Sequence, residues 1–114
     1  MEKRYGDNLK FDFDIDERML SYKIIPLSLQ VLLENAIKHN VISDKQPFTV
    51  WVFTDYENST IIVLNAIQPK IDKNNGNGIG LANLSERYRL KWNTDITISD
   101  DGDDFAVIIK LKRK

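Results

Sequence analysis

The strongest periodic signal in the chain lies between residues 29 and 40, where apolar residues recur at the spacing of one buried helix face. Their positions follow an i, i+3, i+4, i+7, i+8 pattern and are Leu29, Leu32, Leu33, Ala36 and Ile37. This spacing predicts an amphipathic helix. Pro26 suits its first turn, because the N–H that proline lacks would be unpaired there, and Asn40 suits a left-handed C-terminal cap.

Alternation of apolar and polar residues predicts half-buried strands on both sides of this helix. The first strand is 9–15, with an apolar side made of Leu9, Phe11, Phe13 and Ile15. The second is 47–54. Trp51 and Phe53 lie on one of its faces and other apolar residues lie on the opposite face, so both faces of this strand are expected to be partly covered. Residues 16–21 form a polar connector with room for one helical turn.

The second half of the chain predicts one more helix and three more strands. Residues 60–64 are almost continuously apolar, as expected for a central strand, and strands are also expected over 95–99 and 105–112. Apolar residues at helical spacing predict a helix over 80–92. Residues 68–77 break all periodicity, which predicts a mobile loop. Strands before and after two amphipathic helices predict an α+β fold, a two-layer α/β sandwich with both helices on one face of the sheet.

Length and composition narrow the possible functions. The 114 residues suit one domain, and a chain that begins almost directly with a strand pattern is expected to be part of a larger protein. A net charge of −1 without a basic stripe gives no reason to expect nucleic acid as a partner. The absence of cysteine excludes disulfides and thiolate chemistry. No apolar run approaches a membrane span and the N-terminus is no signal peptide, so we expect no direct membrane contact and a cytosolic location.

Two stretches carry candidate chemistry. The polar side of the first helix bears a carboxylate, an amide, an ammonium and an imidazole, at Glu34, Asn35, Lys38 and His39. Oxygen ligands can hold a hard cation, and the cationic groups can meet phosphate. Glycines ahead of the second helix, at Gly76, Gly78 and Gly80, permit positive φ and turn unpaired N–H groups toward an anion. The competing interpretations are an ordinary solvated helix face and a flexible linker.

Together these stretches resemble the N box and second glycine box of the GHKL ATP-binding family. More narrowly, the chain resembles the catalytic domain of LytS-type sensor histidine kinases, in the form common in Bacteroidetes. The order and separation of the matching pieces make the resemblance specific, and it runs nearly end to end. The pieces are Arg4–Asp7, Ile25–Pro26, Leu29–Gln30, Glu34–His39, Asn65–Lys70, Gly78–Leu81, Asn83 and Arg87–Tyr88.

The resemblance implies a Bergerat-type fold with a mixed, mostly antiparallel sheet and a flexible ATP lid over 68–77. It implies that ATP and Mg²⁺ bind, that Asn35 ligates Mg²⁺, and that Glu34 acts in catalysis by orienting water or the incoming group. Other groups implied to contact ATP are Lys38, His39, Asn65, Gly76, Gly78, Gly80, Leu81 and Asn83. For His39, a half-buried structural role is a close alternative to contact with phosphate. For Arg87, a structural ion pair is the corresponding alternative.

The implied function is to present the ATP γ-phosphate to a histidine on an upstream dimerisation domain. A response regulator, of the LytTR type, would then be the partner of the full kinase, and the domain would be the cytoplasmic part of a kinase anchored in the inner membrane. One position departs from the family pattern: Asn65 stands where an Asp usually accepts a hydrogen bond from adenine, without the glycines that normally follow. The alternatives are therefore a degenerate GHKL module used for docking, or an anti-sigma-type serine kinase.

Overall fold

The computed structural model describes residues 9–38, 48–67 and 79–113. These residues form five strands, two α-helices and one 3₁₀ turn, in the order that the hydrophobic pattern predicts. The elements are β1 (Leu9–Asp14), η2 (Glu17–Met19), α1 (Ser28–Lys38), β2 (Phe48–Asp55), β3 (Thr60–Ala66), α2 (Ile79–Trp92), β4 (Thr97–Asp100) and β5 (Asp104–Lys110). The predicted mobile loop over 68–77 and the predicted cap at Asn40 lie outside the described residues.

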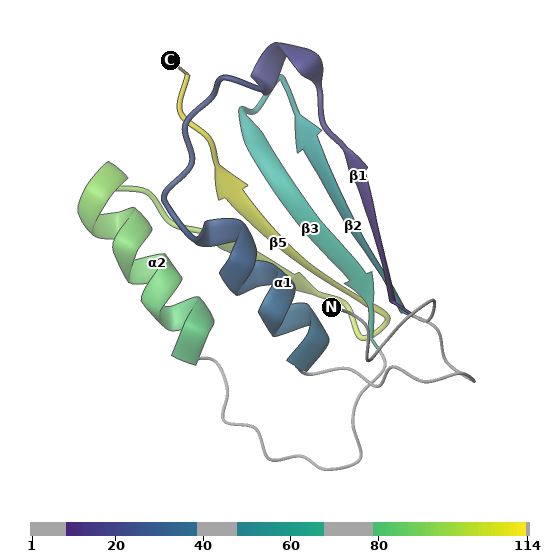
Figure 1. Ribbon diagram of the computed structural model, residues 1–114. Coiled ribbons are helices and arrows are strands. Elements are labelled where there is room, and N and C mark those ends of the chain that lie inside the picture. The colour runs from purple at the N-terminus through teal and green to yellow at the C-terminus, as the bar shows by residue number, and fades with distance from the viewer. Residues whose placement is uncertain (1–8, 39–47, 68–78, 114) are drawn as a thin grey trace.

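The strands form one mixed sheet in the order β1-β2-β3-β5-β4, and both helices lie on the same face of it (Figure 1). Only β1 and β2 are parallel; the other three neighbouring pairs are antiparallel. A parallel pair needs a long crossover between its strands, and α1 supplies it. The predicted two-layer α+β architecture is therefore confirmed, and the apolar run 60–64 is confirmed as the central strand.

The core fills the space between the helices and the sheet. Leu32 and Ala36 of α1 and Leu84 and Tyr88 of α2 are buried, as the helical spacing requires. The sheet contributes alternate residues of its inner strands, because successive side chains of a strand point to opposite faces. Those buried on the helix side are Phe48, Val50, Val52, Ile61, Val63, Val107 and Ile109.

The start of α1 differs from the prediction. The helix begins at Ser28, so Pro26 precedes it and does not occupy its first turn. Leu27 instead acts as the cap: it has a left-handed φ of 69°, and its carbonyl accepts a hydrogen bond from the N–H of Val31 at 3.0 Å. Ser28 is buried, and its hydroxyl contacts the carbonyl of Ile25 at 2.6 Å and the Tyr88 hydroxyl at 3.0 Å. This pair of hydroxyls ties the beginning of α1 to α2.

The apolar side of β1 is less buried than the alternation predicts. Phe11 and Phe13 are 40% and 54% exposed, although they lie beside Val50 and Val52 on the helix side of the sheet. β1 is an edge strand, and the two helices lie over the part of the sheet away from it, toward β5 (Figure 1). The periodicity correctly predicted which side the rings lie on, but it could not predict where the helical layer ends.

Candidate functional site

The C-terminal end of α1, the C-terminal end of β3 and the N-terminal end of α2 lie toward the same end of the molecule (Figure 1). The start of α2 packs against the first turn of α1, since a Cβ added at Gly80 would lie 3.6 Å from Cγ1 of Val31. Asn35, Asn65, Gly80 and the residues just after Gly80 all belong to these ends. The fold therefore brings together candidate residues from positions more than forty apart in the sequence.

The side chains of Asn35 and Glu34 lie in different surroundings. Asn35 lies one helical turn after Val31 and so on the side of α1 that faces the start of α2, where it is half-buried. Glu34 is exposed and lies one turn after Gln30, whose side-chain amide donates to its carboxylate at 3.3 Å. Of these two adjacent residues, Asn35 is therefore the one that α1 turns toward the other candidate residues.

Asn65 is the most deeply buried of the candidate residues, at 1% exposed. Its Nδ2 donates to the carbonyl oxygen of Ala66 at 2.9 Å. No hydrogen bond to its Oδ1 is formed within the described ranges. A buried acceptor without a donor is costly, by about 1–3 kcal/mol, and is a place where a ligand N–H group can bind favourably. Among the described residues, the side chain thus makes a structural contact through its nitrogen and none through its oxygen.

The first turn of α2 presents backbone N–H groups that have no partner within the helix. Gly80 lies in this turn, and it does not have the positive φ expected of it; among the described glycines only Gly102 has one. A Cβ at position 80 would make an ordinary contact with Val31. Leu81 packs half-buried against the core, so its backbone is the part available to a ligand, whereas Asn83 is exposed one turn into the helix.

The remaining predicted residues cannot be placed as side chains. Lys38 is the last residue of α1, and His39, Gly76 and Gly78 lie outside the described residues. Arg87, whose predicted alternatives are a phosphate contact and a structural ion pair, donates to the backbone carbonyl of Pro26 at 3.2 Å. That contact connects α2 to the segment before α1, and no sequence pattern indicated it.

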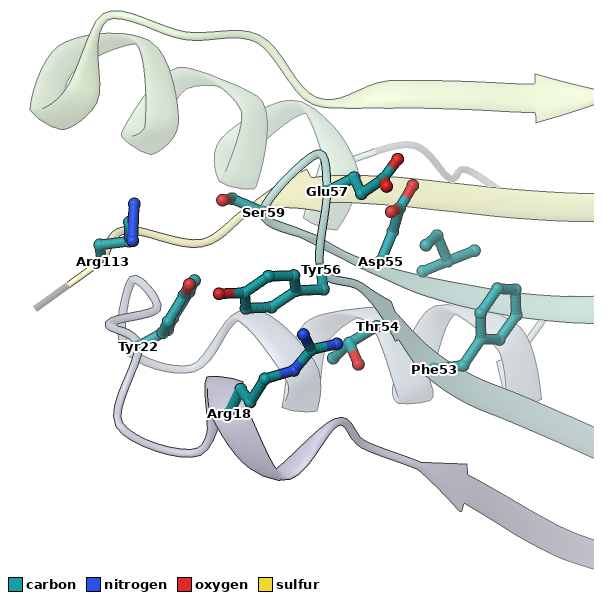
Figure 2. Close-up of a pocket in the computed structure, with 10 residues that line it drawn as sticks. Arg18, Tyr22, Phe53, Thr54, Asp55, Tyr56, Glu57, Ser59 and Arg113 are labelled. Atoms are coloured by element: carbon teal, nitrogen blue, oxygen red, sulfur yellow. The ribbon is translucent and has the colours of Figure 1, made fainter.

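A separate hollow of about 710 Å³ lies at the opposite end of the sheet, beside the turn between β2 and β3 (Figure 2). Arg18, Tyr22 and Tyr56 point toward one another there, with the Arg18 guanidinium 3.6 Å from the centre of the Tyr56 ring. Arg18 also pairs with Asp16 at 2.6 Å, and hydrogen bonds from the Arg18 side chain and backbone lower the pKa of Asp16 to about 2. Arg18 thus contacts both Asp16 and Tyr56, as is typical of an arginine with a structural role.

The domain is therefore an α+β sandwich with a candidate ligand site where α1, β3 and α2 meet. No established family profile matches it. It is 31% identical over 99 residues to Sensor protein LytS of Enterococcus faecalis, covering 84% of this chain and 14% of that protein. It is 26% identical over 103 residues to Sensor protein LytS of Oceanobacillus iheyensis, covering 76% of this chain and 18% of that protein.

The chain is thus similar to part of LytS-type sensor proteins, which confirms the predicted resemblance to that group of proteins. It spans less than a fifth of the length of either relative. None of the helices formed by residues 9–38, 48–67 and 79–113 is long and apolar enough to cross a membrane.

Proposed function

We propose that this chain is the ATP-binding catalytic domain of a LytS-type sensor histidine kinase, with the GHKL fold. The observation that carries the proposal is the buried Asn65 at the end of β3, whose amide oxygen accepts no hydrogen bond from a described residue. The adenine amino group is a donor that such an acceptor would bind. Similarity to two LytS sensor proteins supports the same function independently.

The residues divide the work of holding the nucleotide. Asn65 would accept from the base, the N–H groups at the start of α2 would donate to phosphate, and Asn83 is close enough in sequence to assist them. Asn35 would be a ligand of Mg²⁺, which needs only one or two protein ligands because water and phosphate complete its shell. Bound Mg²⁺ would neutralise charge that develops on the transferring phosphate. Glu34, exposed beside Asn35, would orient water or the incoming group.

The whole protein would use this domain to phosphorylate a histidine on a dimerisation domain outside the chain, and would pass the phosphate to a response regulator of the LytTR type. Such a kinase would be anchored in the inner membrane with this domain in the cytoplasm. Lys38 and His39 would meet phosphate from the end of α1, and Gly76 and Gly78 would belong to the lid. The domain alone is expected to bind nucleotide and to phosphorylate little.

Calorimetric titration with ATP, in the presence and absence of Mg²⁺, tests the proposal. We expect binding in the micromolar to millimolar range that strengthens with Mg²⁺. Ligand at about 100 times Kd would stabilise the fold by about 2.7 kcal/mol, which a thermal melt would detect. If neither method detects binding at several millimolar Mg²⁺-ATP, the catalytic assignment is wrong.

A docking module that has lost nucleotide affinity is the second candidate. The bond from Asn65 to the carbonyl of Ala66 favours it, because this bond gives the side chain a structural reason to be an amide rather than a carboxylate. This candidate predicts an intact fold with no nucleotide-dependent stabilisation, the opposite result in the same titration.

A further inference from the structure

The face of the sheet turned away from the helices has an ordered arrangement of its own. Strand pairing aligns its side chains in two rows that run across the five strands, and each row repeats the same sequence of chemical types. From β1 to β4 these are an acid, an aromatic ring, two aliphatic residues and a hydroxyl. The rows are Asp12, Trp51, Leu64, Ala106, Ser99 and Asp14, Phe53, Ile62, Ile108, Thr97.

The centre of this face is more apolar than a solvated sheet face requires. Antiparallel sheets with one face in water normally alternate between apolar residues inside and polar residues outside. Here Trp51 is 39% exposed, and the aromatic and aliphatic residues beside it are only half-buried. Single exposed apolar residues are ordinary, but a contiguous group marks an interaction surface. A hollow of about 560 Å³ lies over Trp51, Phe53 and Leu64.

The charge around this hollow has one sign. Asp12, Asp14 and Asp104 line it, and none of the three carboxylates forms an ion pair or a side-chain hydrogen bond within the described residues. Lys10 lies next to Asp12 on this face at the start of β1, and Lys110 lies next to Ile108 at the end of β5, where its ammonium donates to the carbonyl of Asn58 at 3.1 Å; neither lysine forms an ion pair with a described residue. Because Asp12 is beside Trp51 and Asp14 beside Phe53 in the strand register, each aromatic ring has a negative charge on its β1 side.

We propose that this open face is a docking surface for a basic amphipathic helix of a partner protein. The apolar part is three strands wide, or roughly 10 Å, which matches the diameter of one helix. The two rows are roughly 7 Å apart along the strands, a little more than one helical turn. A helix lying along the strands would insert one apolar residue into each row and place Lys or Arg beside Asp12 and Asp14.

The charge of this face argues against a second copy of the chain as the occupant. A second copy of this face would add three more carboxylates to the contact and no cation at its centre. A helix with Lys or Arg on one flank neutralises Asp12 and Asp14, steers the encounter and sets its orientation, because these two acids border the β1 side of the apolar part, whereas Asp104 lies on β5 beside Ala66. The surface lies across the sheet from the site where α1, β3 and α2 meet, so the inference does not rest on nucleotide binding.

The probe is a fluorescein-labelled 18-residue peptide with Leu at i, i+3, i+4, i+7 spacing and Lys elsewhere, titrated with the intact chain by anisotropy. A matched peptide has Glu in place of every Lys. We expect the Lys peptide to bind and the Glu peptide not to. Trp51→Ser should weaken binding about tenfold, as for an aromatic anchor. The double variant Asp12→Asn/Asp14→Asn should weaken it about tenfold and flatten its salt dependence.

The matched control is Glu17→Gln/Glu86→Gln, which removes the same number of charges from exposed positions away from this face. It should bind within twofold of the unsubstituted chain. Equal losses in both double variants would mean that bulk charge alone attracts the peptide, and the proposal would be wrong. It would also be wrong if Trp51→Ser left the peptide affinity unchanged. A third contrary result would be sedimentation showing that the unsubstituted chain self-associates and that Trp51→Ser abolishes this association. The Asn replacements keep the shape of exposed side chains, so circular dichroism should confirm an unchanged fold.

Discussion

Replacing Asn65 with Asp tests the proposed nucleotide site most directly. The substitution keeps the size and shape of the side chain and changes only its charge and its ability to donate. In the structure the Asn65 amide nitrogen donates to the Ala66 carbonyl at 2.9 Å, and the oxygen, which accepts no bond from a described residue, is the group proposed to meet a base. An aspartate therefore loses the first contact and strengthens the second.

The two effects have different sizes. Losing the hydrogen bond costs about 1 kcal/mol, and a carboxylate left beside the Ala66 carbonyl at a position only 1% exposed adds about 1–3 kcal/mol. The unliganded Asn65→Asp domain should thus be about 2–4 kcal/mol less stable than the unsubstituted domain. If the side chain meets the adenine amino group, charge assistance strengthens that bond by roughly 1 kcal/mol, or about fivefold in Kd.

Calorimetry with ATP and GTP on the same variant separates the two effects. Both nucleotides carry the same triphosphate, and a general loss of stability affects both equally. Guanine presents a carbonyl oxygen where adenine presents its amino group, so the carboxylate should favour ATP and disfavour GTP. If ATP and GTP affinities change by the same factor, residue 65 does not contact the base and the site must be placed elsewhere.

Four further substitutions test individual contacts. Asn35→Ala should remove the Mg²⁺-dependent part of ATP binding without unfolding the domain, and a melt showing an unfolded variant would mean that Asn35 is structural. In urea unfolding, Tyr88→Phe should lower the free energy of unfolding by about 1 kcal/mol. Ser28→Ala should lower it by about 1–3 kcal/mol, because it removes the hydroxyl that the buried Tyr88 hydroxyl contacts at 3.0 Å. Values near zero for both variants would contradict this hydrogen bond. By NMR, Asp16 should titrate near 2, and higher after Arg18→Gln, although the backbone N–H of residue 18 still donates to its carboxylate and keeps its pKa below 3.8. Since its folded pKa is lowered, its contribution to stability is present above pH 4 and disappears as pH falls toward 2; an unchanged titration after Arg18→Gln would rule out this cause.

Periodicity predicted the layers of this fold because burial on one face leaves a regular trace in a sequence. The order of helices and strands, the central position of β3 and the buried residues Leu32, Leu84 and Tyr88 all follow from it. The exposure of Phe11 and Phe13 did not follow, because it depends on where the helical layer ends over the sheet. That boundary is set by packing between distant segments and has no local pattern.

The candidate site was predictable in part for a similar reason. The motif resemblance named Asn35, Asn65 and Gly80 together, and the fold brings the three elements that carry them to one end. It could not indicate that Asn65 binds the Ala66 carbonyl, or that Gly80 lies in a regular helical turn. Those facts depend on the backbone at the ends of β3 and α2, which the residue types leave open.

β3 connects the two proposed surfaces and explains why they should act independently. Alternation places Asn65 on the helix side and Leu64 on the open face, where it pairs with Trp51. A partner helix over Leu64 would therefore contact the strand that holds Asn65 but not its side chain. We expect Trp51→Ser to leave the ATP affinity within twofold, and Asn65→Asp to do the same for peptide affinity. Any coupling must be reciprocal, so a peptide that changed ATP affinity would have its own affinity changed by ATP by the same factor. Such coupling can be measured by titrating each ligand in the presence of the other. It would show that the two faces of β3 move together, so that placing the two sites on opposite faces of the strand does not make them independent.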